Sequence, residues 1–200
     1  ARGKAAVAEI ESAGGKAEFL AADLASLAEI RHLAEAVRAR TNRLDILINN
    51  AGIGTAGAKR QVSADGYELR FAVNYLAGFL LTSELLPLLK ASAPARIVNV
   101  ASAGQQAIDF GDVMLTHGYS GVRAYCQSKL AQILFTVDLA EQLKGTGVTV
   151  NALHPASYMN TTMVRQAGVT PWSSVETGAE AIVHLAASPA LAGRTGLYLD

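Results

Sequence analysis

The feature that most constrains the fold is a regular alternation of short apolar runs with longer stretches of helical periodicity. The apolar run Leu44 to Ile48 ends abruptly at Asn49-Asn50, a pattern typical of a strand buried in a parallel sheet. Before it, Ser26 and Glu29 stand three residues apart, as in a capping box, and apolar residues then recur every three or four positions. The alternation predicts strands joined by crossover helices.

Applied to the whole chain, this pattern predicts an α/β fold with a doubly wound, Rossmann-like parallel sheet. Two hundred residues fit one domain, and we expect 1–200 to form it. We expect strands at 17–22, 44–48, 96–100, 148–153 and 196–199, and helices at 5–11, around 30–37, at 63–90, around 130–137 and at 175–187.

Composition excludes several classes of function. The 17 basic and 17 acidic residues balance, so nothing favours nucleic acid as a partner. Cys126 is the only cysteine, so no disulfide can form within the chain, which fits a reducing compartment. The apolar stretch 71–81 is interrupted by Asn74 and Gly78 and is short for a bilayer. The histidines show no metal-ligand spacing. We expect a soluble cytoplasmic protein without metal or membrane.

Tyr125 and Lys129 are four residues apart in a predicted helix, so both side chains lie on one helical face. A free tyrosine has a pKa of roughly 10, and a nearby cation lowers it, which would make a general acid or base. Chance spacing on a surface helix is the alternative. Ser102 follows the strand 96–100, where ligands of parallel sheets bind, or it is an ordinary turn serine.

These residues form part of a larger set, which comprises Asn49-Asn50-Ala51-Gly52, Asn74, Ser102, Tyr125, Lys129 and His154-Pro155. The set resembles the short-chain dehydrogenase/reductase superfamily, and the runs 71–82 and 124–131 are similar to its retinol-dehydrogenase-like branch. The resemblance implies an NAD(P)-dependent oxidoreductase that interconverts a small apolar alcohol and its carbonyl compound, and a possible homo-oligomer.

The resemblance also implies a role for each residue. Tyr125 would be the acid or base, and Lys129 would lower its pKa and bind the nicotinamide ribose. Ser102 would orient the substrate oxygen, and Asn74 would hold a water in a proton relay. The catalytic set is therefore Asn74, Ser102, Tyr125 and Lys129. The cofactor-binding set is Asp23, Leu24, Asn50, Ala51, Gly52, Tyr125, Lys129, Pro155, Ala156 and Thr161, with Ala156 replacing the usual glycine and Thr161 displaced by one position.

The family's opening strand, Gly-rich turn, helix and second strand have no counterpart in this sequence. The stretch 52–57 matches G-x-G-x-x-G, but the next predicted helix starts near Ser63, about six residues too late to hold a pyrophosphate at its N-terminus. We expect an N-terminally truncated domain, incomplete at its C-terminus as well, with 44–48 as an exposed apolar edge. The choice between NAD and NADP stays open, because the deciding residue would end the second strand.

Two other functions compete with the oxidoreductase. A non-catalytic dinucleotide-binding or scaffold protein could use the same fold. An inactive truncated chain could survive as an interaction module. The intact set of catalytic residues argues against the first. Met159, Met163 and Trp172 would line an apolar substrate or simply pack a loop, and Tyr119 is substrate-side or structural.

Overall fold

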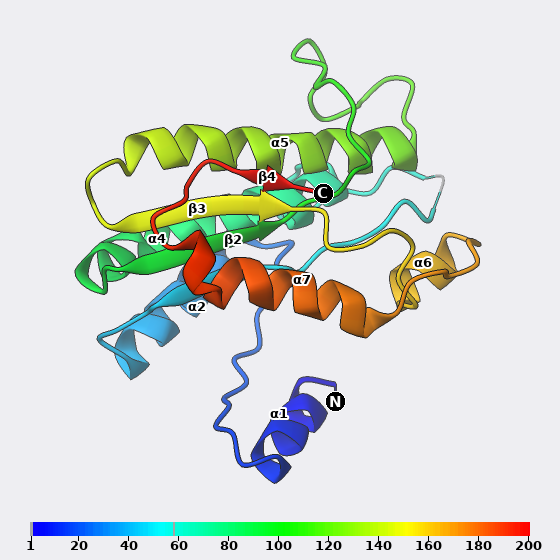
Figure 1. Cartoon of the computed structure of the whole chain (residues 1–200). Helices are drawn as coiled ribbons and strands as arrows, with labels where there is room; N and C mark the ends of the chain where they lie inside the picture. The colour runs from blue at the N-terminus through cyan, green and yellow to red at the C-terminus, as the bar shows by residue number, and fades with distance from the viewer. Residues whose placement is uncertain (1, 58) are drawn as a thin grey trace.

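A computed structural model describes residues 2–57 and 59–200. Within these residues it contains a four-stranded, wholly parallel sheet in the order β1-β2-β3-β4 (Figure 1). The strands are β1 (Ile46–Asn49), β2 (Ala95–Val100), β3 (Val148–Leu153) and β4 (Tyr198–Leu199). Strands that follow one another in the chain are neighbours in the sheet, and each connection carries helix. This is the predicted α/β fold.

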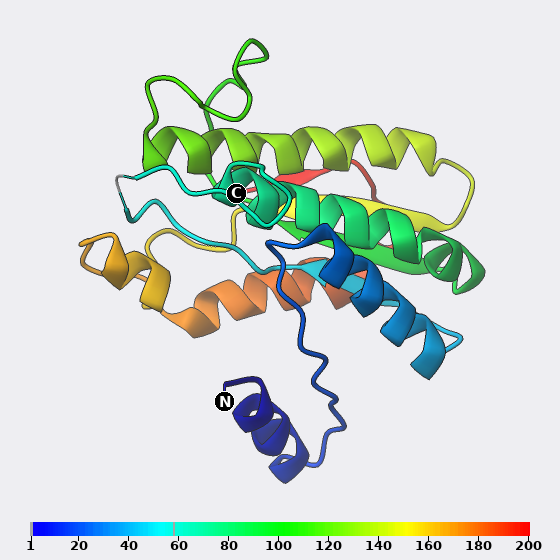
Figure 2. The same cartoon turned by 180° about the vertical axis from the view of Figure 1, so that it is seen from behind.

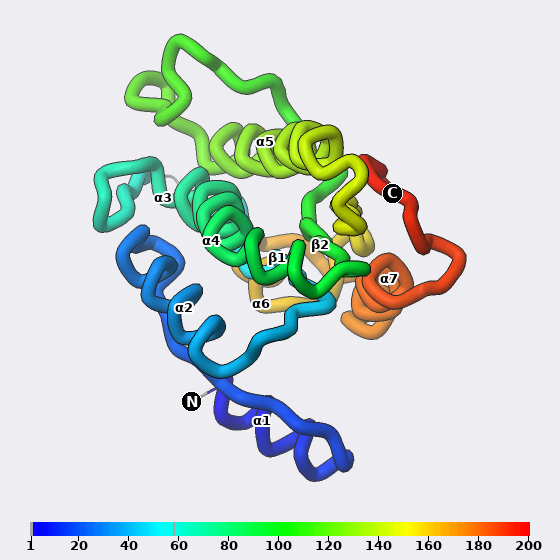
Figure 3. The backbone as a smooth tube through the Cα atoms, turned by 90° about the vertical axis from the view of Figure 1, so that its left-hand side faces the viewer, coloured from blue at the N-terminus to red at the C-terminus, as the bar shows by residue number. Residues whose placement is uncertain are grey.

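Helices cover both faces of the sheet, as the end-on view in Figure 3 shows. On one face lie α4 (Ala77–Ala91) and α5 (Gly121–Gln142), with α2 (Leu27–Arg40) packed on α4. The opposite face is covered by α7 (Val175–Ala187). Successive side chains of a strand point to opposite faces. Ile97 therefore joins the core under α4 and α5, and Val98 joins the core under α7.

The predicted strand at 17–22 is absent, so the sheet has one strand fewer than expected. Residues 15–23 form an extended connection between α1 (Arg2–Ser12) and α2, and α1 stands apart from the sheet (Figure 2). No residue of α1 is buried. A strand requires a hydrogen-bonded neighbour, and β1 is an edge whose outer side faces no other described strand. Ile46 and Ile48 are accordingly 38% and 40% exposed, as the sequence predicted for this edge.

The long helix predicted from Ser63 begins later. Residues 63–67 form a turn in which the Ser63 amide donates to the Tyr67 carbonyl (2.8 Å) and Gly66 has a φ of +84°. The helix then runs through α3 (Leu69–Phe71), a π-helical turn η1 (Ala72–Leu76) and α4. By length and composition alone this 23-residue run could cross a membrane. In this structure it packs against α2, α5 and the sheet.

The predicted bounds of β3 and α7 are confirmed, and β4 is shorter than expected. The Ser26 hydroxyl accepts a hydrogen bond from the Glu29 amide (3.4 Å), which is one half of the predicted capping box. Two short helices were not predicted, α6 (Thr162–Gln166) and the 3-10 turn η2 (Pro189–Leu191).

Candidate active site

The candidate site lies where the parallel strands end. The loop after β1, the segment after β2, the turn after β3 and the N-terminal end of α5 gather at this one end of the molecule (Figure 1). Parallel sheets place ligands at this edge because all their strands end there. Most of the predicted site residues follow these strand ends or lie on α5.

Lys129 is buried at this edge on α5, with 4% of its surface exposed. Its Nζ donates to the Val100 carbonyl at the end of β2 (2.8 Å) and to Gln132 Oε1 (2.9 Å). It also lies 5.8 Å from the centre of the Tyr125 ring, so the two side chains share one helical face as predicted. Burial disfavours the ammonium and lowers the pKa of Lys129 from 10.5 to about 8.

In this structure the pKa of Tyr125 lies above its ordinary value, in the direction opposite to the one expected from the sequence. Burial of the phenol raises the pKa of Tyr125, because the phenolate would lose its hydration. A side-chain hydrogen bond with Ser102 acts in the opposite direction and is outweighed. The lysine is itself desolvated and is hydrogen-bonded to a main-chain carbonyl. The tyrosine therefore carries its proton at neutral pH.

Asn74 is placed by the π-helical turn, a feature often found at functional sites. Its side chain is 1% exposed and binds the Ile53 backbone twice: Oδ1 accepts from the Ile53 amide (2.8 Å) and Nδ2 donates to the Ile53 carbonyl (3.1 Å). Nδ2 also donates to Ser128 Oγ (3.0 Å). Asn74 thus joins the loop after β1 to the helix that carries Tyr125 and Lys129.

Ser102 lies two residues beyond β2 and is nearly buried. Its Oγ accepts a hydrogen bond from the Gly104 amide (3.0 Å). A Cβ added at Gly104 would lie 3.4 Å from Ser102 Oγ and 3.7 Å from Tyr125 Cε1, so this glycine lies against both side chains. Ser102, Tyr125 and Lys129 therefore form one cluster.

In the loop 52–57, Gly52 and Gly54 allow close packing against neighbouring side chains. A Cβ at Gly52 would lie 3.1 Å from Asn74 Oδ1 and 3.8 Å from Lys129 Nζ, so the backbone passes close to the catalytic candidates. The carbonyls of Gly54 and Ala56 both accept hydrogen bonds from the Arg70 guanidinium. The next helix starts only at Leu69. A phosphate loop presents amides at a helix N-terminus, and this loop does not.

The other predicted cofactor residues range from exposed to buried. Asp23 Oδ1 accepts from the Ala25 amide (2.9 Å), and the turn at Asp23-Leu24 leads into α2. No described contact joins this turn to Tyr125 or Lys129. Asn50 and Ala51 are exposed, Pro155 is buried after β3 and Ala156 is half-buried. Thr161 caps α6, because its Oγ1 accepts from the Val164 amide (3.4 Å).

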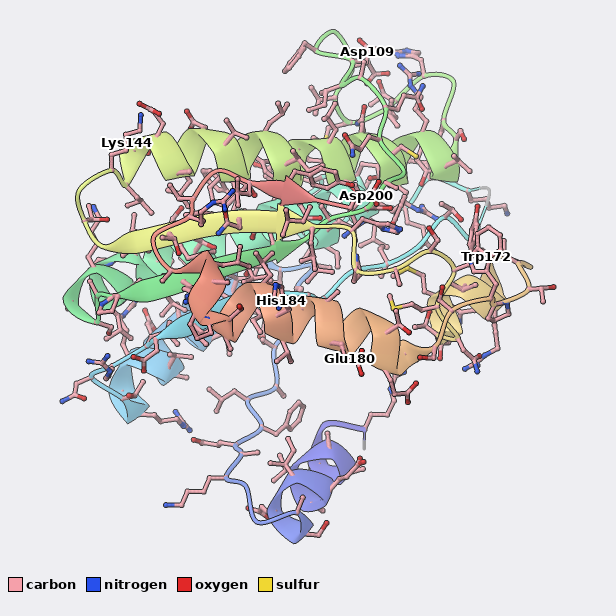
Figure 4. All side chains as sticks on the ribbon, in the orientation of Figure 1. Asp109, Lys144, Trp172, Glu180, His184 and Asp200 are labelled. Carbon is pink, nitrogen blue, oxygen red and sulfur yellow. The ribbon has the colours of Figure 1, made fainter. Side chains whose placement is uncertain are left out.

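The segment 158–172 lies over the loop after β1. A Cβ at Gly54 would lie 2.4 Å from Met163 Cγ, so Met163 rests on this loop. The rings of Tyr158 and Trp172 are in tilted contact, with their centres 5.4 Å apart, and Trp172 is 74% exposed. Figure 4 shows Trp172 beside α6, at the opposite end of the molecule from Lys144.

Sequence reasoning missed several polar residues that build the site. Ser128 bridges Asn74 and its own helix, donating to the Tyr125 carbonyl (2.7 Å), and Gln132 binds Lys129. Asn49, named from the sequence only as part of a motif, donates from Nδ2 to Asn99 Oδ1 (2.8 Å) in the interior. Their signal was present as polar residues inside apolar helices and strands. Among the described residues, no three His, Cys, Asp or Glu side chains gather closely enough to hold a metal ion.

Comparison with known proteins gives a consistent result. The family model described as short chain dehydrogenase matches residues 1–171. Human retinol dehydrogenase 13 is 46% identical over 182 residues, covering 88% of this chain and 54% of the relative. Human retinol dehydrogenase 14 is 41% identical over 191 residues, covering 88% and 56%. A Pseudomonas aeruginosa RhlG/NADP active-site complex superimposes with a TM-score of 0.74 and 31% identity, covering 98% and 80%. The chain spans about half the length of the curated relatives it matches.

Proposed function

Because this chain belongs to the short chain dehydrogenase family, in its retinol-dehydrogenase-like branch, we propose that it carries the proton-transfer centre of an NAD(P)-dependent oxidoreductase. The reaction would interconvert a hydrophobic alcohol and its aldehyde or ketone. The observation that carries the proposal is the cluster of Ser102, Tyr125 and Lys129 at the carboxyl edge of the sheet, with Lys129 Nζ held on the Val100 carbonyl. A positioned phenol and amine at this edge suit acid–base chemistry.

In this proposal Tyr125 gives its proton to the carbonyl oxygen during reduction and takes it back during oxidation. Ser102 orients that oxygen by hydrogen bonding. Lys129 supplies positive charge beside the phenol as phenolate character develops. Asn74 fixes the loop after β1 against α5 and stands beside the lysine, where a relayed proton would pass.

The chain fits the nicotinamide end of the cofactor. An ammonium has three hydrogens to donate, and two of those of Lys129 are used by Val100 and Gln132, so one is available to a ribose hydroxyl. Gly52 brings the backbone close to that amine with no side chain in between. Pro155, Ala156 and Thr161 would meet the amide, and Asp23, Leu24, Asn50 and Ala51 the adenosine side. When bound, the nicotinamide supplies or accepts the hydride.

A hydrophobic substrate suits the segment 158–172. This segment contributes Met163 over Gly54, and the exposed ring of Trp172 lies in tilted contact with Tyr158. Such side chains favour apolar ligands. The names of the relatives point to retinol as one candidate. We include a cytoplasmic location in the proposal, supported by the single, half-buried Cys126, and cell fractionation would test it.

The test compares this chain with a chimera in which a relative's strand, Gly-rich turn, helix and second strand precede it. NADH and NADPH binding is titrated by nucleotide fluorescence, and turnover is measured with retinaldehyde and a long-chain aldehyde. We expect turnover from a chain that binds the nucleotide. Tyr125→Phe should lower kcat by about 10²- to 10⁴-fold while nucleotide binding stays within two-fold, because only the transferred proton is lost.

Three outcomes would contradict the proposal. If neither chain binds a nicotinamide nucleotide, a scaffold or interaction role takes its place. If nucleotide binds but no apolar carbonyl turns over, the chain binds dinucleotides without catalysis. If Tyr125→Phe keeps full activity, the phenol does not move the proton. Tyr67→Phe, on the exposed turn before α3, is the matched control and should leave turnover unchanged.

A further inference from the structure

A buried ion pair at the N-terminal end of α3 has no part in the chemistry described above. Arg70 and Glu68 lie 3.8 Å apart, with side chains 5% and 0% exposed. Glu68 Oε2 accepts from the Phe71 amide (2.7 Å) and so caps the helix. Its Oε1 accepts from the Tyr119 hydroxyl (3.0 Å). Both charges are therefore committed to specific partners, as buried charges must be.

Arg70 connects two segments that are far apart in the sequence. Its Nε donates to the Gly54 carbonyl (2.8 Å) and a second nitrogen to the Ala56 carbonyl, both in the loop after β1. A third nitrogen donates to the Tyr119 hydroxyl. The planar guanidinium makes these contacts from one rigid group, which a lysine cannot do.

The same junction includes the first residue of α5. A Cβ at Gly121 would lie 2.6 Å from the Thr55 carbonyl and 2.8 Å from the Gly57 carbonyl, so the start of α5 lies directly on the loop. Tyr119 lies next to the last residue of the long loop 103–120, called the insertion below, which begins just after Ser102 and leads into the helix of Tyr125. In Figure 4 the labelled Asp109 marks this insertion above α5, on the side of the helix away from the sheet.

We propose that Glu68, Arg70 and Tyr119 form a positioning cluster that couples the loop 52–57, on the cofactor side, to the insertion 103–120, on the substrate side. Arg70 is the hub, because among the described residues it is the side chain that hydrogen-bonds to both segments. Tyr119 connects the hub to the insertion only. This inference rests on the proposed function for its kinetic consequences, whereas the physical coupling does not depend on activity.

The test uses Arg70→Lys and Tyr119→Phe, singly and together. Arg70→Lys keeps the charge beside Glu68 but loses the several hydrogen bonds of the planar guanidinium. We therefore expect the KM values for nucleotide and carbonyl both to rise about ten-fold, the effect of one or two lost hydrogen bonds. Tyr119→Phe should raise only the carbonyl KM by about as much. Because the two residues share one hydrogen bond, the carbonyl KM of the double variant should rise by less than the product of the two single rises.

Arg123→Lys is the matched control, because Arg123 pairs with Asp109 (2.8 Å) in the same insertion. It should leave the nucleotide KM unchanged. Hydrogen exchange provides a readout without activity: Arg70→Lys should speed exchange in 52–57 and 103–120 together, Tyr119→Phe in 103–120 alone, and neither in α7. Exchange that rises evenly through α7 and the strands, or Arg70→Lys loosening only one segment, would overturn the coupling. An inactive parent chain with coupled exchange would instead refute only the proposed function.

Discussion

The low pKa of Lys129 makes a quantitative prediction about stability. The unfolded lysine keeps its proton up to about 10.5, whereas the folded one releases it near 8. Between these values the unfolded state binds more protons, so the free energy of unfolding rises with pH. The full difference of about 2.5 pKa units corresponds to about 3 kcal/mol. Of this, about 2 kcal/mol should appear between pH 7 and 9.5.

The assay is urea unfolding followed by far-ultraviolet circular dichroism, at steps of half a pH unit, for the wild type and Lys129→Met. Burial also raises the pKa of Cys126 and of Tyr125, which works against stability at high pH. Both groups are present in the variant, so subtracting the two curves isolates the lysine. Between pH 7 and 9.5 the free energy of unfolding of the wild type should increase by about 2 kcal/mol relative to that of the variant.

Lys144→Met is the control, because Lys144 is an exposed lysine paired with Glu141 far from the site. Its curve should run parallel to the wild type. Two results would refute the claim that the folded structure desolvates this ammonium. One is a free energy of unfolding that changes with pH equally for Lys129→Met and the wild type. The other is a wild type that becomes less stable relative to the variant as pH rises from 7 to 9.5.

Two further predictions concern packing and the edge of the sheet. Gly121→Ala should lower the free energy of unfolding by about 1–3 kcal/mol, because the new methyl meets the main-chain carbonyls of Thr55 and Gly57. Gly54→Ala should lower it less, because Met163 is a flexible side chain that can move away. Equal midpoints of the two variants in thermal unfolding would contradict this. Ile48→Lys on the exposed edge strand should reduce concentration-dependent light scattering. Val183→Lys on α7, which is 60% exposed but not on an edge, should leave the scattering unchanged. Equal effects of the two variants would show that association does not use the β1 edge.

The elements whose bounds were predicted correctly have residues at their ends that terminate a strand or cap a helix. Gly147 precedes β3 and His154-Pro155 follows it, and Ser174 caps α7 with its hydroxyl on the Thr177 amide (3.1 Å). The stretch 17–22 has comparable apolar content but no neighbour to pair with. Whether a segment is a strand depends on its partner, which local sequence does not describe.

The site shows the same limit. Spacing along a helix correctly placed Tyr125 beside Lys129, because that relation is local. Spacing says nothing about burial, and burial raises the pKa of the tyrosine instead of lowering it. The hub at Arg70 depends on a contact with Tyr119, 49 residues away in the sequence. Its parts appeared only as an arginine inside a predicted helix and a tyrosine of open role.

The contacts divide the predicted site into two parts with different dependence on the rest of the chain. Asn74, Ser128, Lys129 and the end of β2 hold one another through hydrogen bonds that all lie between residues 53 and 132. Asp23 and Leu24 belong to the turn before α2, whose contacts run to the turn at 63–65. In the proposed acid–base centre these hydrogen bonds therefore come from the loop after β1, the end of β2, η1 and α5. It follows that changes around Asp23 should alter nucleotide affinity without moving Tyr125 or Lys129, and that the pH-dependent stability due to Lys129 should persist in a chain that binds no nucleotide.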